Sequence, residues 1–428
     1  MIYNNRYCFV LRNSKNLFYK FTLNNSKNLF LQSYNHRGIT SSSIFKENII
    51  NFSISIDSLD KIHILYASVN GSIKYTVHPS NFHKDINIFN ANDKSSNILF
   101  LTLKIIKFKP HIFYILENKL YPSNHSIYHC FWDNNTFRSI KIEDITFSRY
   151  TYPYIVDIIN DNIYLFYTKN YDNSFSIKKF DTSLQTWSNY DNGIFLPSAN
   201  NANFLINDKS TALLCYNSSF NKNIQTFVKY KILDSSKSSQ WSNPIMLSDG
   251  TTNSSHASII NNNGNTYVIW EENGQLVYRT SLYGKDDWEH KKNLIHKSEK
   301  LFTGVYLSNH QIDKNYKSVF TTFNLGVFPY PVINFEGESS NEFYIDTNSS
   351  NNSIFMPINN TVINYNKKEK IYIQQLQSTI DDKEKKIIEL SQHNLILKSE
   401  LDQKNKQLKN LEQKSKEKNW LWKFLKNY

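Results

Sequence analysis

Short apolar segments alternate with polar turns along most of the chain, and they do so in repeated units. One unit reads as an apolar strand over Lys61–Tyr66, the dipeptide Asn70-Gly71 and an alternating strand over Ser72–Tyr75. A later unit has the same order, at Asn265–Trp270, Asn273-Gly274 and Gln275–Tyr278. Asn-Gly favours tight hairpins because both turn positions need a positive φ. The pattern therefore predicts a series of β-hairpins.

The last large apolar residue of the first strand in each pair recurs about every 50 residues, which is the period of propeller blades. A repeat of this length, made only of short strands, is typical of blades with four strands each. No helical periodicity precedes Lys367. The chain is therefore predicted to be all-β, with a β-propeller of seven blades over residues 1–358, or six if the first and last units merge. The anchors of the seven units are Leu11, Tyr66, Leu116, Tyr167, Tyr216, Trp270 and Phe323.

The two ends of the repeat region predict how the ring closes. The first unit begins with the strand Arg6–Arg12, which we interpret as its second strand, and the last unit covers Leu301–Ile345. A further apolar segment, Ile354–Ile358, lies between polar stretches. We expect it to complete the first blade, because a closed ring removes exposed sheet edges.

After a polar linker over residues 359–366, the pattern changes to heptads, and residues 367–418 are predicted to form a long α-helical coiled coil. Ile at position a and Leu at position d favour two parallel strands, and a single Asn at a fixes the register and the dimer. Asn394 is that residue. The residues expected to form the homodimer are Ile373, Ile380, Ile387, Asn394, Leu397 and Leu401. A single amphipathic helix that docks elsewhere is the alternative.

Residues 419–428 form a basic, aromatic tail whose contact residues are predicted to be Trp420, Trp422, Lys423, Phe424 and Leu425. Trp and Phe next to Lys favour the interface of a membrane with anionic lipid. Docking into a groove of a partner protein is an equal alternative, and an end cap of the coiled coil is the third.

Net charge and composition limit the classes of partner and the cellular locations that we expect for the protein. The net charge is +12, and residues 367–428 hold 15 Lys against 9 Asp and Glu, a net charge of +6. Only six cations are Arg, the residue usually recruited for phosphate, so no nucleic-acid partner is expected. Neither a signal peptide nor a membrane-spanning run is visible. We expect a location in the cytoplasm or peripherally at the membrane or cell surface, and the abundant Asn, Lys and Ile are typical of an AT-rich, for example bacterial, genome.

Three tryptophans follow the third strand of their units, at Thr186-Trp187-Ser188, Gln240-Trp241-Ser242 and Asp287-Trp288-Glu289. The segments that end in them resemble the Asp-box turn of the sialidase-like propeller superfamily, roughly Ser-x-Asp-x-Gly-x-Thr-Trp. The resemblance covers three of the seven units and implies the fold and the blade register, not an activity. The arginine triad of sialidases and its Phe/Tyr-Arg-Ile-Pro motif have no counterpart here.

The residues that could carry chemistry give no catalytic motif, no metal site and no cofactor site. Adjacent acids occur at Glu143-Asp144, Glu271-Glu272 and Asp286-Asp287, each near a turn where solvated acids are ordinary. His125 and His129 have a spacing that would suit two metal ligands only on a helix, so surface or hydrogen-bonded roles are expected. The three cysteines, Cys8, Cys130 and Cys215, lie among apolar residues and are expected to be buried free thiols.

Exposed aromatic loops are the stronger sign of a binding role, because Tyr and Asn can stack on sugar rings and form hydrogen bonds with them. The candidate ligand-binding residues are Tyr150, Tyr152, Tyr171 and Asp172. We therefore predict a non-catalytic binding or scaffold protein, with a propeller that recognises a glycan or protein and a stalk that makes it bivalent. The alternative is a glycan-acting hydrolase with two carboxylates at the propeller's active site.

Overall fold

The structure is a computed structural model, and it describes residues 8–35, 38–79, 85–90, 96–118, 125–133, 136–147, 152–169, 174–196, 199–233, 240–294 and 301–324. The chain divides into two units, Met1–Ile345 and Asp346–Tyr428. All of the described residues belong to the first unit. The predicted closing segment Ile354–Ile358, the coiled coil and the tail lie outside them and stay predictions.

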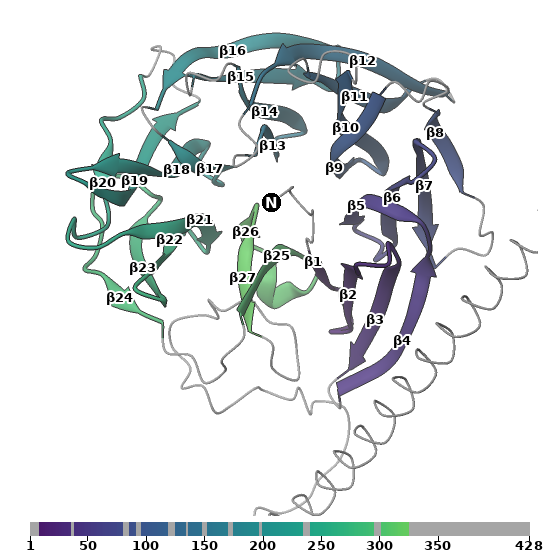
Figure 1. Cartoon of the computed structure of the whole chain (residues 1–428), viewed down its shortest axis with the longest axis horizontal. Helices are drawn as coiled ribbons and strands as arrows, with labels where there is room; N and C mark the ends of the chain where they lie inside the picture. The colour runs from purple at the N-terminus through teal and green to yellow at the C-terminus, as the bar shows by residue number, and fades with distance from the viewer. Residues whose placement is uncertain are drawn as a thin grey trace, which may run out of the picture. The chain divides into compact units, whose positions relative to one another are not determined.

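Six sheets of at least four strands follow one another around a ring, so the first unit is a six-bladed β-propeller (Figure 1). Blade one holds β1 (Cys8–Arg12), β2 (Phe18–Leu23), β3 (Leu29–Asn35) and β4 (Gly38–Lys46). Blade two holds β5 (Ile49–Ile56), β6 (Ile62–Ser68), β7 (Ser72–His78) and β8 (Ile86–Asn90). Blade three holds β9 (Ser96–Ile106), β10 (Lys109–Asn118), β11 (His125–Asp133) and β12 (Thr136–Ile145).

The other three blades have the same order, with the inner strand first. Blade four holds β13 (Tyr154–Ile159), β14 (Asn162–Thr168), β15 (Ser174–Asp181) and β16 (Thr186–Phe195). Blade five holds β17 (Asn200–Ile206), β18 (Thr211–Phe220), β19 (Asn223–Ile232) and β20 (Ile245–Met246). Blade six holds β21 (Ser254–Asn262), β22 (Asn265–Glu272), β23 (Gln275–Leu282) and β24 (Lys292–Asn293). The remaining elements are β25 (Leu301–Ser308), the 3₁₀-helix η1 (Gln311–Asp313), β26 (Lys317–Ser318) and β27 (Thr321–Asn324).

The prediction of seven blades was wrong, and the error lies in the first and last units. The strand that holds Leu11 is the inner strand β1 of a complete blade, and the second strand is β2. The described part of the last unit forms no blade. Instead, β25 pairs in parallel with β1, β27 pairs with β25, and β26 pairs with β21. The two units thus share one sheet, as the six-blade alternative required.

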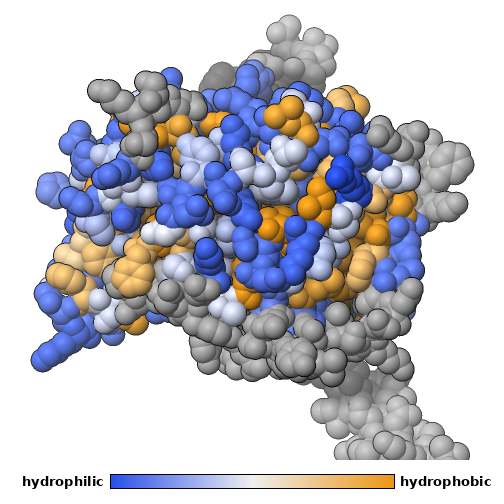
Figure 2. Space-filling view, turned by 90° about the horizontal axis from the view of Figure 1, so that it is seen from above, coloured by the Kyte–Doolittle hydropathy of each residue, from blue (hydrophilic) through white to orange (hydrophobic). Residues whose placement is uncertain are grey.

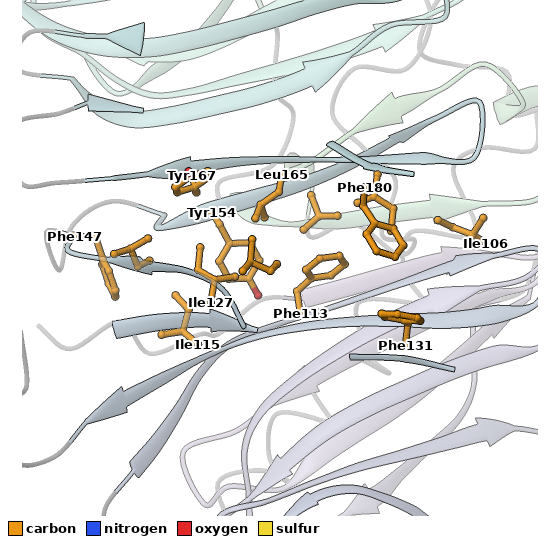
Figure 3. Packing of buried hydrophobic residues seen from close by; sticks show 14 residues of the cluster. Ile106, Phe113, Ile115, Ile127, Phe131, Phe147, Tyr154, Leu165, Tyr167 and Phe180 are labelled. Carbon is orange, nitrogen blue, oxygen red and sulfur yellow. The ribbon is translucent and has the colours of Figure 1, made fainter. Parts of the chain in front are cut away.

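Hydrophobic side chains fill the spaces between neighbouring blades. The cluster between blades three and four contains Phe113, Phe131, Tyr154 and Phe180, which point toward one another from facing sheets (Figure 3). Similar clusters join blades one and two, two and three, four and five, and five and six. On the rim, the outer strands β12 and β16 are largely exposed, and Figure 2 shows hydrophilic and hydrophobic residues intermixed on the face seen there.

The joint between blades six and one is built differently, by the segment 301–318. Tyr306 packs with Cys8, Val10 and Phe18 of blade one. Tyr316 packs against this cluster and also against the cluster of blade six. The segment is therefore a wedge between the two blades, which we call the closing wedge.

Polar contacts fix the closing wedge to blade one. The Oδ2 atom of Asp313 accepts hydrogen bonds from Arg12 at 3.0 Å, from Tyr306 at 2.7 Å and from Ser308 at 2.7 Å. Arg12 and Asp313 are both buried. Because three donors converge on one buried carboxylate oxygen, the ring is closed by a charged latch as well as by apolar packing.

Candidate functional site

A cavity of about 100 Å³ lies among the inner strands of blades one to four. Its wall is completed by β25 and by the segment 318–320, so residues from both ends of the propeller meet there. In Figure 1 the inner strands surround the centre of the ring, and β26 and β27 lie beside it. Cavities among convergent strands are common ligand sites. We therefore take this cavity as the candidate site.

One end of the cavity is aromatic. The rings of Tyr152 and Phe320 stack with their centroids 4.6 Å apart, and Phe100 lies edge-on to Tyr152 at 6.4 Å. Tyr154 donates a hydrogen bond from its hydroxyl to the carbonyl of Phe100, which has a positive φ of 49°. Tyr152 and Tyr154 border the first residues of β13, so this end lies near the start of the inner strands.

The charged end of the cavity borders an ion pair that lies next to the lining residues Val156 and Ser318. The Nζ atom of Lys317 lies 2.9 Å from Oδ1 of Asp157 and donates to the carbonyl oxygens of Ile158 at 3.2 Å and Ile206 at 2.7 Å. Asp157 also accepts the amide of Ile206 at 2.6 Å. This ion pair ties the closing wedge to the inner strands of blades four and five.

Lys104 lines the same cavity from β9. Among the described residues, its ammonium group has no hydrogen bond and no ion pair. Burial lowers the pKa of Lys104; the charge of Asp157 raises this pKa, and that of Lys317 lowers it. Lys104 and Lys317 are thus two cations that share the single carboxylate of Asp157.

Of the four predicted ligand-binding residues, the structure describes only Tyr152, which lies in the lining of the cavity. Tyr150, Tyr171 and Asp172 are outside the described residues. Next to Tyr152, the carbonyl oxygen of Pro153 accepts a hydrogen bond from the amide of Thr168 at 2.9 Å. The binding role of Tyr152 remains a prediction.

The adjacent acids of the sequence do not form a catalytic pair. Glu143 pairs with Lys178 at 2.7 Å, and Asp144 pairs with Lys141 at 2.7 Å. Carboxylates of the other two pairs also have partners. Buried Glu272 accepts hydrogen bonds from Thr252, Trp270 and Lys291. Exposed Glu271 lies beside His256, and Asp286 accepts a hydrogen bond from Tyr230. None of these carboxylates lines the cavity, and two of them, Glu143 and Asp286, bond to side chains of a neighbouring blade.

His125 and His129 lie inside a strand of blade three, and both are buried. Of the two roles expected for them, surface or hydrogen-bonded, His129 has the hydrogen-bonded one. The Nε2 atom of His129 lies 3.0 Å from Nδ1 of His111 on β10, and its ring stacks on Phe113 at 4.5 Å. Burial lowers the pKa of His111 to about 4 and lowers that of His129 as well. Among the described residues, no group of three His, Cys, Asp or Glu side chains could hold a metal ion.

A buried series of hydrogen bonds in blade two, from Asp57 through His63 to Tyr75, resembles the arrangement of a catalytic relay. Nε2 of His63 lies 3.1 Å from Oδ2 of Asp57, and its Nδ1 lies 2.5 Å from the hydroxyl of Tyr75. Burial and the nearby Asp57 raise the pKa of Tyr75, so its hydroxyl stays protonated and is a poor nucleophile. The series serves to satisfy buried polar groups.

The three cysteines are buried free thiols, as the sequence predicts. Burial raises the pKa of Cys8 and of Cys130 to about 12, and it raises that of Cys215 too. These values leave the thiols protonated and unreactive at neutral pH. In the part of the chain that the structure describes, no helix has the length and apolarity needed to span a membrane.

The sequence could have indicated Lys104 only weakly, because a lysine in the alternating run Ser96–Ile106 reads as an outward-facing residue of a half-buried strand. The two faces of an inner strand are turned toward the neighbouring blades, and its free edge borders the central channel. An inner strand therefore has no face turned outward to solvent. The residues of the closing wedge that complete the cavity were assigned to a seventh blade, so their approach to β9 and β13 could not be predicted.

Comparisons with known proteins reach no further than the fold. No family model and no curated protein sequence matches the chain. Among solved structures, the fucose-specific lectin from Aleuria aurantia is 9% identical, with a TM-score of 0.38 and coverage of 67% of this chain and 95% of that one. The Hadza microbial sialidase Hz136 is 10% identical, with a TM-score of 0.41 and coverage of 62% and 63%.

A prolyl endopeptidase structure is 11% identical, with a TM-score of 0.43 and coverage of 67% of this chain and 42% of that one. These likenesses, all with TM-scores below 0.5, assign neither a family nor a ligand to the chain. The β-propeller fold rests on the strand order of the chain itself.

Proposed function

We propose that the chain is a non-catalytic binding module whose propeller recognises a glycan at the end of blade four that carries Tyr152. The observation that carries this proposal is the aromatic end of the cavity, where Tyr152, Phe100 and Phe320 supply ring faces and Thr102 supplies a hydroxyl group. Sugar rings present both apolar C–H faces and hydroxyls, so such a lining complements them. A protein ligand at the same loops is the alternative.

A glycan screen with the full chain tests the proposal. Tyr152→Ala is expected to weaken binding of any glycan found by tenfold or more, because stacking on a half-buried ring is lost. Tyr230→Ala, on β19 of blade five, is the matched control and is expected to bind as the wild type does. The proposal is wrong if no glycan binds at millimolar concentration or if Tyr152→Ala binds unchanged.

We further propose that residues 367–418 dimerise in parallel and that the tail around Trp420 and Trp422 attaches the dimer to anionic membrane or to a partner groove. Two propellers on one stalk would raise the effective affinity for a multivalent ligand. Sedimentation equilibrium is expected to give a dimer for the wild type. With Asn394→Leu, oligomers other than dimers should appear, since Asn at position a restricts the number of strands. A monomeric wild type would contradict the proposed stalk.

A further inference from the structure

The charged end of the central cavity contains more positive than negative charge. Lys317 forms an ion pair with Asp157. Lys104, which lines the cavity, is attracted to the same carboxylate, so two lysines share one acid and one positive charge is left over. An unpaired charge in a site of low dielectric is costly. A bound anion would remove this cost.

Unused hydrogen-bond donors lie in the same cavity wall. The buried hydroxyl oxygen of Ser318 on β26 has no hydrogen-bond partner among the described residues. Ser53 accepts the amide of Leu103 at 3.0 Å, and this leaves its hydroxyl proton available. Lys104 and these two serines are all donors, so together they form a site that matches the oxygens of an anion.

The rest of the wall is apolar, with Phe9, Ile54, Val305 and Leu307 among its residues. The ligand should therefore carry an apolar part next to its charge. The volume of about 100 Å³ limits its size, because a cavity of roughly 150 Å³ holds benzene. A molecule of about four to six non-hydrogen atoms fits this space.

From charge, donors and volume together, we infer that the cavity binds a small organic monocarboxylate, with Lys104 as its counterion and Ser318 and Ser53 as hydrogen-bond donors. The carboxylate lies at the charged end, and its apolar part lies toward Phe9 and Leu307. This site lies at the other end of the cavity from Tyr152, which carries the proposed glycan recognition, so either proposal can fail while the other stands. It requires no covalent step.

Thermal unfolding of the full chain with acetate or lactate as the probe tests the site. Either anion is expected to raise the Tm saturably by several degrees, because a ligand that binds only the folded state stabilises it. Acetamide, lactamide and sodium chloride at the same concentrations are expected to raise it far less. An equal shift with chloride or with the amides would overturn the assignment of a carboxylate.

Lys104→Met is expected to abolish the shift with lactate and, since it removes one of two lysines that share a single carboxylate, to leave the free protein folded and at least as stable. Lys104→Gln provides a second neutral variant should the first fail to fold. Lys109→Met, which removes an exposed lysine at the start of β10, is the matched control and is expected to keep the full shift.

A full shift in a folded Lys104 variant would refute the site, as would no shift in the wild type at a ligand concentration about 100-fold above a millimolar Kd. If carboxylates bind and no glycan does, the proposed function fails while this site stands. If glycans bind and carboxylates do not, the reverse holds.

Discussion

His111 and His129 are two titratable side chains held inside the aromatic core between blades three and four. The ring of His129 lies between Phe113 and the edges of Phe180 and Trp187. Burial lowers the pKa of His111 to about 4, and the charge of Lys109 acts in the same direction; the pKa of His129 is also well below its usual range. The folded protein therefore keeps both rings neutral in mild acid.

We predict that the free energy of unfolding decreases as the pH falls from about 6.5 toward 4. The unfolded chain binds protons at these histidines below about pH 6.5, and the folded chain does not, so protonation favours unfolding. His111 alone should account for a loss of about 2 kcal/mol at pH 5. Urea unfolding at pH 7 and pH 5 measures this loss.

His129→Leu should have a smaller difference between the two pH values than the wild type has. His290→Leu, which replaces an exposed histidine, should leave the difference unchanged. An unaltered pH dependence in His129→Leu would show that other groups are responsible. The sequence could not predict this pair, because His111 and His129 are 18 residues apart and become neighbours only through the β10–β11 register.

Some hairpin turns could be predicted from the sequence, and others could not. Asn273-Gly274 forms the predicted two-residue turn, with φ values of 52° and 73°. The Asn70-Gly71 turn is longer, since β6 ends at Ser68 and β7 begins at Ser72. The turns after β1, β5 and β17 are built on Asn13, Asp57 and Asn207, whose Oδ1 atoms each accept two backbone amides. The same kind of turn follows β2 at Asn24, so an Asn or Asp directly after a strand marks a hairpin turn but does not by itself give the register of blade one.

Gly274 and Gly284 in blade six give a matched pair of substitutions. Both have a positive φ, 73° and 71°, so Ala at either position costs about 1 kcal/mol in backbone strain. A Cβ at Gly274 meets no atom within 4 Å, whereas one at Gly284 would lie 2.5 Å from the buried side chain of Leu213. Gly284→Ala is therefore expected to cost about 1–3 kcal/mol more than Gly274→Ala, as measured by urea unfolding. Equal costs would show that Leu213 in blade five can move away from the added Cβ without a loss of stability.

At the scale of the whole molecule, five joints between blades are continuous apolar clusters, and the sixth contains the closing wedge. The sequence predicted the repeat, the strands and closure by residues from both ends of the propeller. It could not predict that the closing residues enter the channel, because an apolar strand such as Leu301–Ser308 reads the same whether it begins a blade or pairs with β1. Their partners are far away in the chain, as Arg12 and Asp313 are, 301 residues apart.

We predict that Asp313→Ala destabilises the propeller by about 3–5 kcal/mol, because it leaves Arg12 buried without its partner. Asp286→Ala, which removes a more exposed acid bonded to Tyr230, should cost less than about 1 kcal/mol. Native-state hydrogen exchange should show faster exchange in β25 and β1 of Asp313→Ala before other strands are affected. Uniform loss of protection across all six blades would contradict a local latch.

The latch also imposes an order on biosynthesis. Arg12 leaves the ribosome 301 residues before Asp313, its partner, is made. Until then, the inner edge of blade one has no β25 to pair with, and blade six lacks the wedge that joins it to blade one. The nascent chain is thus an open arc with an unpaired strand at its first edge, and such edges recruit other chains. For this propeller, the period most exposed to misassembly is the interval after blade six has been made and before the closing wedge follows it out of the ribosome.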